Sequence, residues 1–291
     1  MIRATRSGFY DLAQHAAARQ NSELRSVQEK AITGLAINRP SDDPDALSEV
    51  HRLRAAAGNQ DVYTDNSNRA ADILNTTDQA LSTASNAMLK AREIAVQAAN
   101  GTYNDVDRKN LADVVGALRT TLINAANTEY DGHYLFSGTA YDQPAFDDTG
   151  AYMGTADAPM IEVGPGQYVH GGAVGSDVFQ GAADAFQTLT DLETALNAND
   201  ITGVRNSLTD IDLASDQITA TRVSFGAESA TADDAMTLST ALRDVLAGRL
   251  GELVNADPVE TYTDLSQLQT TYQSTLQVTA SVGSKTLFDM L

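Results

Sequence analysis

The sequence of 291 residues contains no cysteine and no tryptophan, and aromatic residues make up only 6% of it. Without cysteine, the chain has no disulfide framework, no thiolate metal site and no cysteine nucleophile. The shortage of aromatic residues argues against a thick globular core and favours long helices that meet along thin alanine and leucine seams. The length is nevertheless sufficient for one or two domains with a hydrophobic core.

Basic residues are scarce: 19 Lys and Arg stand against 39 Asp and Glu, for a net charge of −20. Residues 1–60 are close to neutral, whereas residues 131–234 hold 17 acidic and only 2 basic side chains. Nucleic acids and anionic membrane surfaces attract clustered Lys and Arg, so we expect neither as a partner. We interpret the acidic block as a solvated outer surface whose charges repel one another.

Long hydrophobic runs and catalytic motifs are also missing from the sequence. No apolar run is long enough to predict a transmembrane helix, and residues 1–10 lack the apolar segment of a cleaved secretory signal. The four histidines are isolated, and neither an H-E-x-x-H, a G-x-S-x-G nor a phosphate-binding loop occurs. We therefore expect no enzyme activity, no metal site and no cofactor.

The most informative feature that is present is a pair of apolar stripes, one near each end of the chain. Their residues recur in steps of three, four and seven, which is the heptad pattern of helices that pair. Neither helix can bury such a stripe alone, so each needs the other terminus, another copy or a different protein. We predict that the stripes form an assembly interface made of Ala13, Ala17, Leu24, Val27, Ala31, Leu265, Leu268, Tyr272, Leu276 and Val282.

A turn rich in proline and aspartate follows the first predicted helix. Gly34 is placed to end that helix, and two prolines, Pro40 and Pro44, interrupt the next residues. Asp43 is the predicted N-cap of a second helix, with Pro44 at its first position.

The middle of the chain differs in composition. Half of the 20 glycines and three of the 6 prolines lie between residues 132 and 181. Residues 134–136, 160–163 and 168–170 are predicted to be short strands between turns. We expect residues 141–180 to project outward and to be dispensable, because loop-rich segments of this kind usually lie on the surface.

These observations predict a mainly α fold: a long antiparallel helical rod with coiled-coil N- and C-terminal arms and a small β-rich insert. The predicted segments are an N-terminal arm (1–40), the first part of the rod (41–135), the β-rich insert (136–181), the second part of the rod (182–256) and a C-terminal arm (257–291).

Several segments resemble the flagellin superfamily. Residues 33–44 read T-G-L-A-I-N-R-P-S-D-D-P, residues 126–138 read A-N-T-E-Y-D-G-H-Y-L-F-S-G, and residues 221–226 read T-R-V-S-F-G. The R-P-S-D-D-P ending and the S-K-T-L-F of residues 284–288 look more like the hook–filament junction branch of the superfamily than like flagellins proper.

The resemblance implies a structural component of the bacterial flagellum that is exported unfolded through the flagellar type III apparatus and lies outside the cell, at the junction of hook and filament. The implied partners are hook-associated protein 1 on the hook side, flagellin on the filament side, neighbouring copies of the chain and an export chaperone. A filament-forming flagellin is the alternative within the superfamily. An enzyme or metal-binding module in the insert and a cytoplasmic coiled-coil scaffold are the alternatives outside it.

Overall fold

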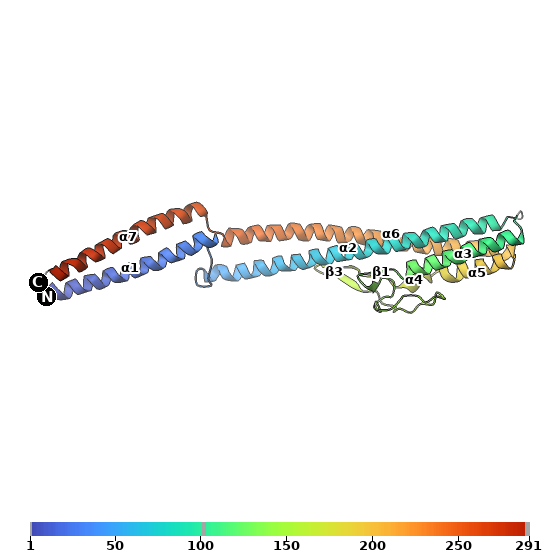
Figure 1. The fold of residues 1–291 in the computed structure, drawn as a ribbon, viewed down its shortest axis with the longest axis horizontal. Helices are drawn as coiled ribbons and strands as arrows, with labels where there is room; N and C mark the ends of the chain where they lie inside the picture. Colours follow the sequence, from blue (N-terminus) through green and yellow to red (C-terminus); the bar gives the residue numbers. More distant parts are fainter. Residues whose placement is uncertain (1, 101–102, 289–291) are drawn as a thin grey trace. The chain divides into compact units, whose positions relative to one another are not determined.

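The computed structural model describes residues 2–100 and 103–288, and it describes burial for residues 8, 11–100 and 103–281. Its helices are α1 (Ile2–Thr33), α2 (Pro44–Ala98), α3 (Asp105–Ala126), α4 (Gly175–Phe179), α5 (Ala185–Asn197), α6 (Ile201–Val254) and α7 (Pro258–Phe288). Its strands are β1 (Glu129–Tyr130), β2 (His133–Tyr134), β3 (Met160–Gly164) and β4 (Gln167–His170). The mainly α fold with small antiparallel sheets, predicted from the sequence, is confirmed (Figure 1).

The chain packs into two units. Met1–Gly58 and Arg243–Leu291 form the first, and Asn59–Leu242 form the second. The long helices α2 and α6 each contribute residues to both units. The five-segment division of the sequence stays a prediction.

Helix ends lie where local side chains satisfy the exposed backbone groups. Gly34 has φ +70 and ends α1, and its N–H donates to the carbonyl of Lys30. Asn104 caps α3 by accepting the Asp107 N–H at 2.8 Å, as its spacing predicts. Gly226 does not interrupt α6, which is one helix of 54 residues.

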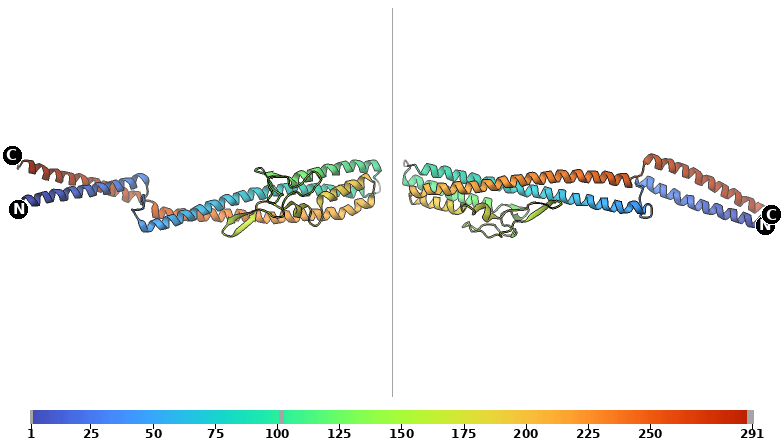
Figure 2. Two further views of the ribbon diagram at one scale, coloured as in Figure 1. Left: turned by 90° about the horizontal axis from the view of Figure 1, so that it is seen from below. Right: turned by 180° about the vertical axis from the view of Figure 1, so that it is seen from behind.

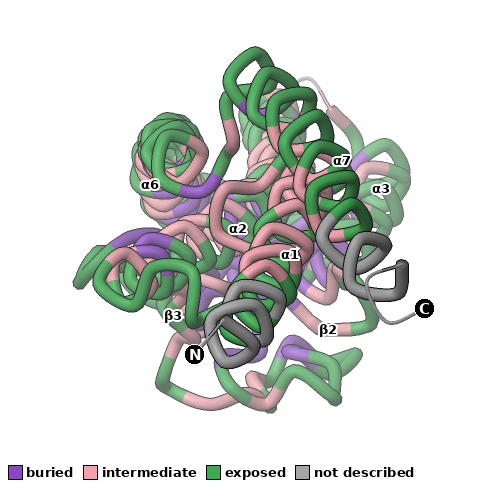
Figure 3. Tube along the Cα trace, turned by 90° about the vertical axis from the view of Figure 1, so that its left-hand side faces the viewer, coloured by how far each residue is buried: buried purple, intermediate pink, exposed green. Residues whose placement is uncertain are grey.

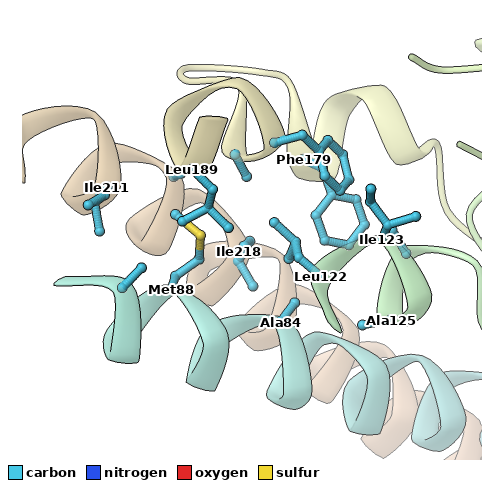
Figure 4. Packing of buried hydrophobic residues seen from close by; sticks show 14 of the residues in the cluster. Ala84, Met88, Leu122, Ile123, Ala125, Phe179, Leu189, Ile211 and Ile218 are labelled. Carbon is cyan, nitrogen blue, oxygen red and sulfur yellow. The ribbon is translucent and has the colours of Figure 1, made fainter. Parts of the chain in front are cut away.

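The core of the second unit lies where α2, α3, α5 and α6 meet. Figure 4 shows Ala84 and Met88 of α2 facing Leu122 of α3, Leu189 of α5 and Ile218 of α6. Each of these five side chains is fully buried. Alanines on α2 let the helices approach closely, which fits the thin seams expected from the composition.

Two short hairpins build the β-rich part of the second unit. β1 and β2 are joined by Asp131 and Gly132, whose φ values of 51 and 76 suit the two-residue turn of a tight hairpin. β3 pairs with β4, and Val163 and Val169 from these strands form a second buried cluster with residues of α2 and α6.

The predicted strand at residues 134–136 begins and ends elsewhere in the structure. Only Tyr134 belongs to β2, because Leu135 and Phe136 turn into the core, where both are buried. Their carbonyls accept the N–H groups of Ala173 at 2.7 Å and Gly175 at 2.8 Å. After Tyr134 the backbone carbonyls therefore pair with residues 173–175 rather than within the β1–β2 hairpin.

Four phenylalanines join the β-rich segment to the helices. Phe146 lies 4.7 Å from Phe186 and 5.6 Å from Phe179 between ring centroids, and Phe136 lies 5.3 Å from Phe179. All four rings are buried in the main core of the second unit. Residues 141–180 are therefore not purely an outer loop segment, because Phe146 and Phe179 are part of the core; that the segment is dispensable for joining stays a prediction.

Arg108 connects three helix ends in the second unit. Its Nε donates to the carbonyl of Ala98 at 3.0 Å, and its Nη2 donates to the carbonyl of Asn100 at 3.1 Å. Its Nη1 donates to Oδ1 of Asn199. Arg108 is only 3% exposed. The charge lies at the C-terminal end of α2, where carbonyl groups have no partner within the helix and a cation is favoured.

Candidate assembly surface

The first unit contains the two terminal helices, which run antiparallel and side by side along their lengths (Figure 2). Asn21 of α1 donates to the Tyr272 hydroxyl of α7 at 2.9 Å, which links residues 251 positions apart in the sequence. Within one chain, each terminal stripe therefore finds the other terminus, one of the three partners that the pattern allows.

The described stripe residues fall short of full burial. They are Ala13, Ala17, Leu24, Val27, Ala31, Leu265, Leu268 and Tyr272, each half-buried, and Leu276, which is exposed. The side chain of Val282 lies outside the described residues. Figure 3 shows pink and green along the described parts of α1 and α7. Pairing within one chain thus leaves a thin seam rather than a closed core.

Hydroxyl side chains line much of α7, and they are turned back onto the helix. Thr271, Ser274 and Thr275 each donate to the carbonyl four residues earlier, at 2.8, 3.0 and 2.9 Å. A threonine that bonds its own helix in this way leaves its methyl group available for contact. The surface of α7 is therefore more apolar than its amino-acid composition indicates. The spacing of the leucines alone does not predict this.

A cavity of about 320 Å³ lies between the two terminal helices. Leu12, Ala13 and Ala16 line it from α1, and Val278 lies among the hydroxyl residues that line it from α7. Leu12 and Val278 are more than half exposed, so this part of the seam lacks the side chains that would fill it.

Large apolar side chains are also exposed elsewhere in the first unit. Ile32, near the end of α1, is 84% exposed, and Val259 and Tyr262, in the first turns of α7, are 76% and 62% exposed. Val245 on α6 is exposed as well. Exposed apolar side chains mark an interaction site where they lie together, and these four are not among the interface residues predicted from the stripes.

The turn after α1 has the predicted cap. Oδ1 of Asp43 accepts the N–H of Asp45 at 3.1 Å and of Ala46 at 2.9 Å, and Pro44 is the first residue of α2. Pro40 is exposed within the turn. The capping role assigned to Asp43 and the position assigned to Pro44 are therefore both found in the structure.

A second Asp-Pro pair does the same at the start of α7. Oδ1 of Asp257 accepts the N–H of Val259 at 2.8 Å and of Glu260 at 3.3 Å, and Pro258 is the first residue of the helix. The Asp257-Pro258 pair is therefore a helix-start signal. Its signal is the same as that of Asp43 and Pro44.

The two linkers that precede these caps are bonded to each other. The Ala36 N–H donates to the Val254 carbonyl at 2.7 Å, and the Ala256 N–H donates to the Gly34 carbonyl at 2.9 Å. Leu35 faces Asn255 in the antiparallel bridge between them. The end of α1 and the start of α7 are therefore held together by backbone as well as by side chains.

Asp42 orders the turn from its other side. Its Oδ2 accepts the N–H of Asn38 at 2.9 Å and of Arg39 at 2.8 Å. The hydrogen bonds from Arg39 and then Asn38 hold the pKa of the Asp42 carboxyl below its ordinary value. A carboxylate with a lowered pKa stabilises the folded turn above its ordinary pKa, and this stability is lost as pH falls through the lowered value.

We therefore expect the turn to loosen in acid. The backbone amide resonances of Asn38 and Arg39 should move toward unbonded shifts as the pH falls through the lowered pKa of Asp42, which lies below the ordinary aspartate value. Asp42→Asn should show the altered shifts at every pH, and Asp45→Asn, in the first turn of α2, serves as the matched control. Shifts of Asn38 and Arg39 that titrate equally in Asp42→Asn would assign the transition to another group.

Two features are absent from residues 2–100 and 103–288. No helix in that part of the chain is long and apolar enough to cross a membrane. Within the same residues, no group of three or more His, Cys, Asp or Glu side chains is arranged to hold a metal ion.

Known proteins resemble this chain in sequence over part of its length. Residues 10–141 match the family described as the bacterial flagellin N-terminal helical region. Hook-associated protein 3 of Escherichia coli K12 is 32% identical over 160 residues, which are 54% of this chain and 50% of that protein. A flagellin of Listeria monocytogenes is 35% identical over 124 residues, which are 42% of this chain and 43% of that protein. The chain spans about half the length of these curated relatives.

Solved structures resemble the fold over most of the chain. A putative flagellar hook-associated protein from Vibrio parahaemolyticus gives a TM-score of 0.68 at 20% identity, covering 74% of this chain and all of the other. A flagellar hook-associated protein 3 from Legionella pneumophila gives 0.64 at 18% identity, covering 70% of this chain and 98% of the other. At these identities the likeness shows the fold.

Proposed function

We propose that this chain belongs to the flagellin superfamily and is the adaptor that joins the hook side of a bacterial flagellum to its filament, which the match of residues 10–141 and the fold support. Proteins named hook-associated protein 3 occur among both its sequence relatives and its structural neighbours, and this agreement carries the proposal. In this role the chain is a structural protein and has no catalytic function.

The incomplete α1–α7 seam supports assembly as its activity. We assign the interface to the stripe residues predicted from the sequence and add the exposed Ile32, Val259 and Tyr262. Each large apolar side chain that becomes buried contributes about 1.5–3 kcal/mol. Neighbouring subunits then supply the contacts that one chain leaves open.

The partners follow from the same role. Hook-associated protein 1 lies on the hook side, flagellin on the filament side and further copies of this chain beside it. An export chaperone covers the terminal helices before export through the flagellar type III apparatus. The mature protein is extracellular, at the hook–filament junction. The two axial faces of such an adaptor differ, so its contacts are heterologous.

The terminal helices should be poorly protected until assembly. Paired helices with a half-buried seam gain little from packing, and isolated helices are marginal in water. We expect amide hydrogens of residues 11–30 to exchange quickly in the dilute monomer and slowly after incorporation, measured by exchange mass spectrometry. Residues 80–95 of the second unit serve as the internal control and should be protected in both states. Strong protection of residues 11–30 in the monomer would contradict the proposed incomplete seam.

The adaptor function itself is tested by mixing purified protein with flagellin seeds or with hook-associated protein 1. We expect binding at one end of each seed, followed by an arrest, as seen by electron microscopy. In cells, deletion of the gene should leave hooks in place while filament subunits are shed into the medium.

A filament-forming flagellin is the second candidate, because the Listeria flagellin is 35% identical over 124 residues. The two candidates differ in self-assembly. Open-ended growth of long filaments from the purified protein alone would reject the adaptor in favour of flagellin.

A further inference from the structure

A second cavity, of about 280 Å³, lies within the second unit between α2 and the β-rich segment. α2 contributes Arg69 and Ile73, which are four residues apart and so lie on one helix face. The β1–β2 hairpin contributes Tyr130, Asp131 and His133. Ligand pockets typically measure about 300–1,000 Å³, and this cavity lies just below that range, which limits it to one small molecule.

Apolar groups form much of the wall of this cavity. Ile73 and Leu135 are buried, and Ile161 is half-buried between the main core and the second cluster. The Tyr141 ring packs edge-on against His133, with 4.9 Å between ring centroids. These surfaces can accept an aliphatic or aromatic group but offer it little polar recognition.

Two opposite charges accompany this apolar wall. Arg69 and Asp131 are both exposed, and the salt bridges among the described residues do not pair them with each other. Burial is the main cause that raises the pKa of Tyr130, with Asp72 and Asp131 raising it further and Arg69 lowering it. The Tyr130 hydroxyl itself donates to Asp72 at 3.2 Å.

One polar atom of the cavity residues lacks a partner. Nδ1 of His133 is buried and has no hydrogen bond within the described part of the chain. A buried polar atom without a partner costs free energy. The Nδ1 atom has almost no solvent-accessible surface, so a ligand in the cavity would not contact it.

We propose that this cavity binds a free apolar α-amino acid, with its carboxylate on Arg69, its ammonium on Asp131 and its side chain against Ile73, Leu135 and Ile161. Arginine recognises carboxylates through two parallel hydrogen bonds. A simple organic cation would be attracted by Asp131 but repelled by Arg69. A simple anion would be attracted by Arg69 but repelled by Asp131. A zwitterion with an apolar side chain satisfies both charges and the wall. The tight β1–β2 turn fixes the backbone of Asp131. The side-chain carboxylate of Asp131 is therefore already near the cavity before a ligand binds.

Calorimetric titration of the full chain with L-leucine and L-phenylalanine tests this site. We expect saturable binding of both. Phenethylamine, which lacks the carboxylate, and 3-phenylpropionate, which lacks the ammonium, should each bind at least about ten-fold more weakly, because each loses one charge-assisted interaction.

Variants assign the two ends of the ligand. Arg69→Gln should remove the preference for phenylalanine over phenethylamine, and Asp131→Asn should remove the preference over 3-phenylpropionate. Asparagine tolerates the left-handed backbone of position 131. Arg54→Gln and Asp216→Asn change exposed charges outside the cavity and should leave binding unchanged. Circular dichroism melting checks that each variant is folded.

The possible results are distinct. Equal binding of phenethylamine and phenylalanine would replace the proposal with a cation site, and equal binding of 3-phenylpropionate would replace it with an anion site. Absence of binding at millimolar amino acid in the folded wild-type protein would overturn it. None of these results depends on whether the chain joins hook to filament.

Discussion

Phe146→Ala is expected to lower the free energy of unfolding of the second unit by about 3–5 kcal/mol, the usual cost of removing a buried aromatic ring. The Phe146 side chain is 1% exposed and contacts the rings of Tyr152, Phe179 and Phe186. Its removal leaves a cavity that the neighbouring rings cannot fill without leaving their rotamers. Urea denaturation followed by circular dichroism measures the loss.

Met153→Ala is the matched control, because Met153 lies in the same segment and is 53% exposed. Its replacement should change stability by no more than about 0.5 kcal/mol. Phe146→Leu should fall between the two variants, since it keeps part of the volume. A loss below about 1 kcal/mol in Phe146→Ala would indicate that the β-rich segment folds separately from the helices.

The second large effect concerns Arg108. Arg108→Met should destabilise the second unit by about 1–3 kcal/mol, because it keeps most of the aliphatic chain but removes the donor from three acceptors, of which the Ala98 carbonyl is buried. These acceptors are the carbonyls of Ala98 and Asn100 and the side chain of Asn199. Thermal and urea unfolding give the change, and Arg108→Lys should recover only part of it, since one ammonium cannot reach three acceptors in the same geometry.

Lys109→Met provides the comparison at the next residue. Lys109 is exposed and pairs with Asp105 at 2.9 Å, one helical turn away. Exposed pairs of this kind contribute about 0.3–0.5 kcal/mol, so this variant should be nearly as stable as the wild type. Equal losses at residues 108 and 109 would contradict the role assigned to the buried guanidinium.

Local signals in the sequence predicted the helix boundaries well. Gly34 and the Asp43-Pro44 pair act through neighbouring backbone groups, so a few residues contain all the information that is needed. That the terminal stripes need a partner helix was predictable for a similar reason, because heptad spacing depends on one helix at a time, but the spacing left open which of three partners they take.

Contacts between residues far apart in the sequence could not be predicted in the same way. Glycine and proline content marks residues 141–180 as loop, but it does not show that Phe146 and Phe179 turn inward to meet Phe186. Arg108 resembles any surface arginine until three helix ends converge on it. The cavity that contains Arg69 depends on α2 and the β1–β2 hairpin lying together, which no local pattern specifies.

The sequence separation of the α1–α7 pair has a consequence for the order of folding. The hydrogen bond between Asn21 and Tyr272 closes a loop of 251 positions, and the entropy lost in such a closure rises with loop length. Contacts between distant segments also form late and slowly. During synthesis α1 leaves the ribosome long before α7 exists, so its apolar stripe has no partner in its own chain until the final residues are made. Refolding followed by a probe near Asn21 should therefore show a slower phase than a probe near Met88, which packs in the core of the second unit.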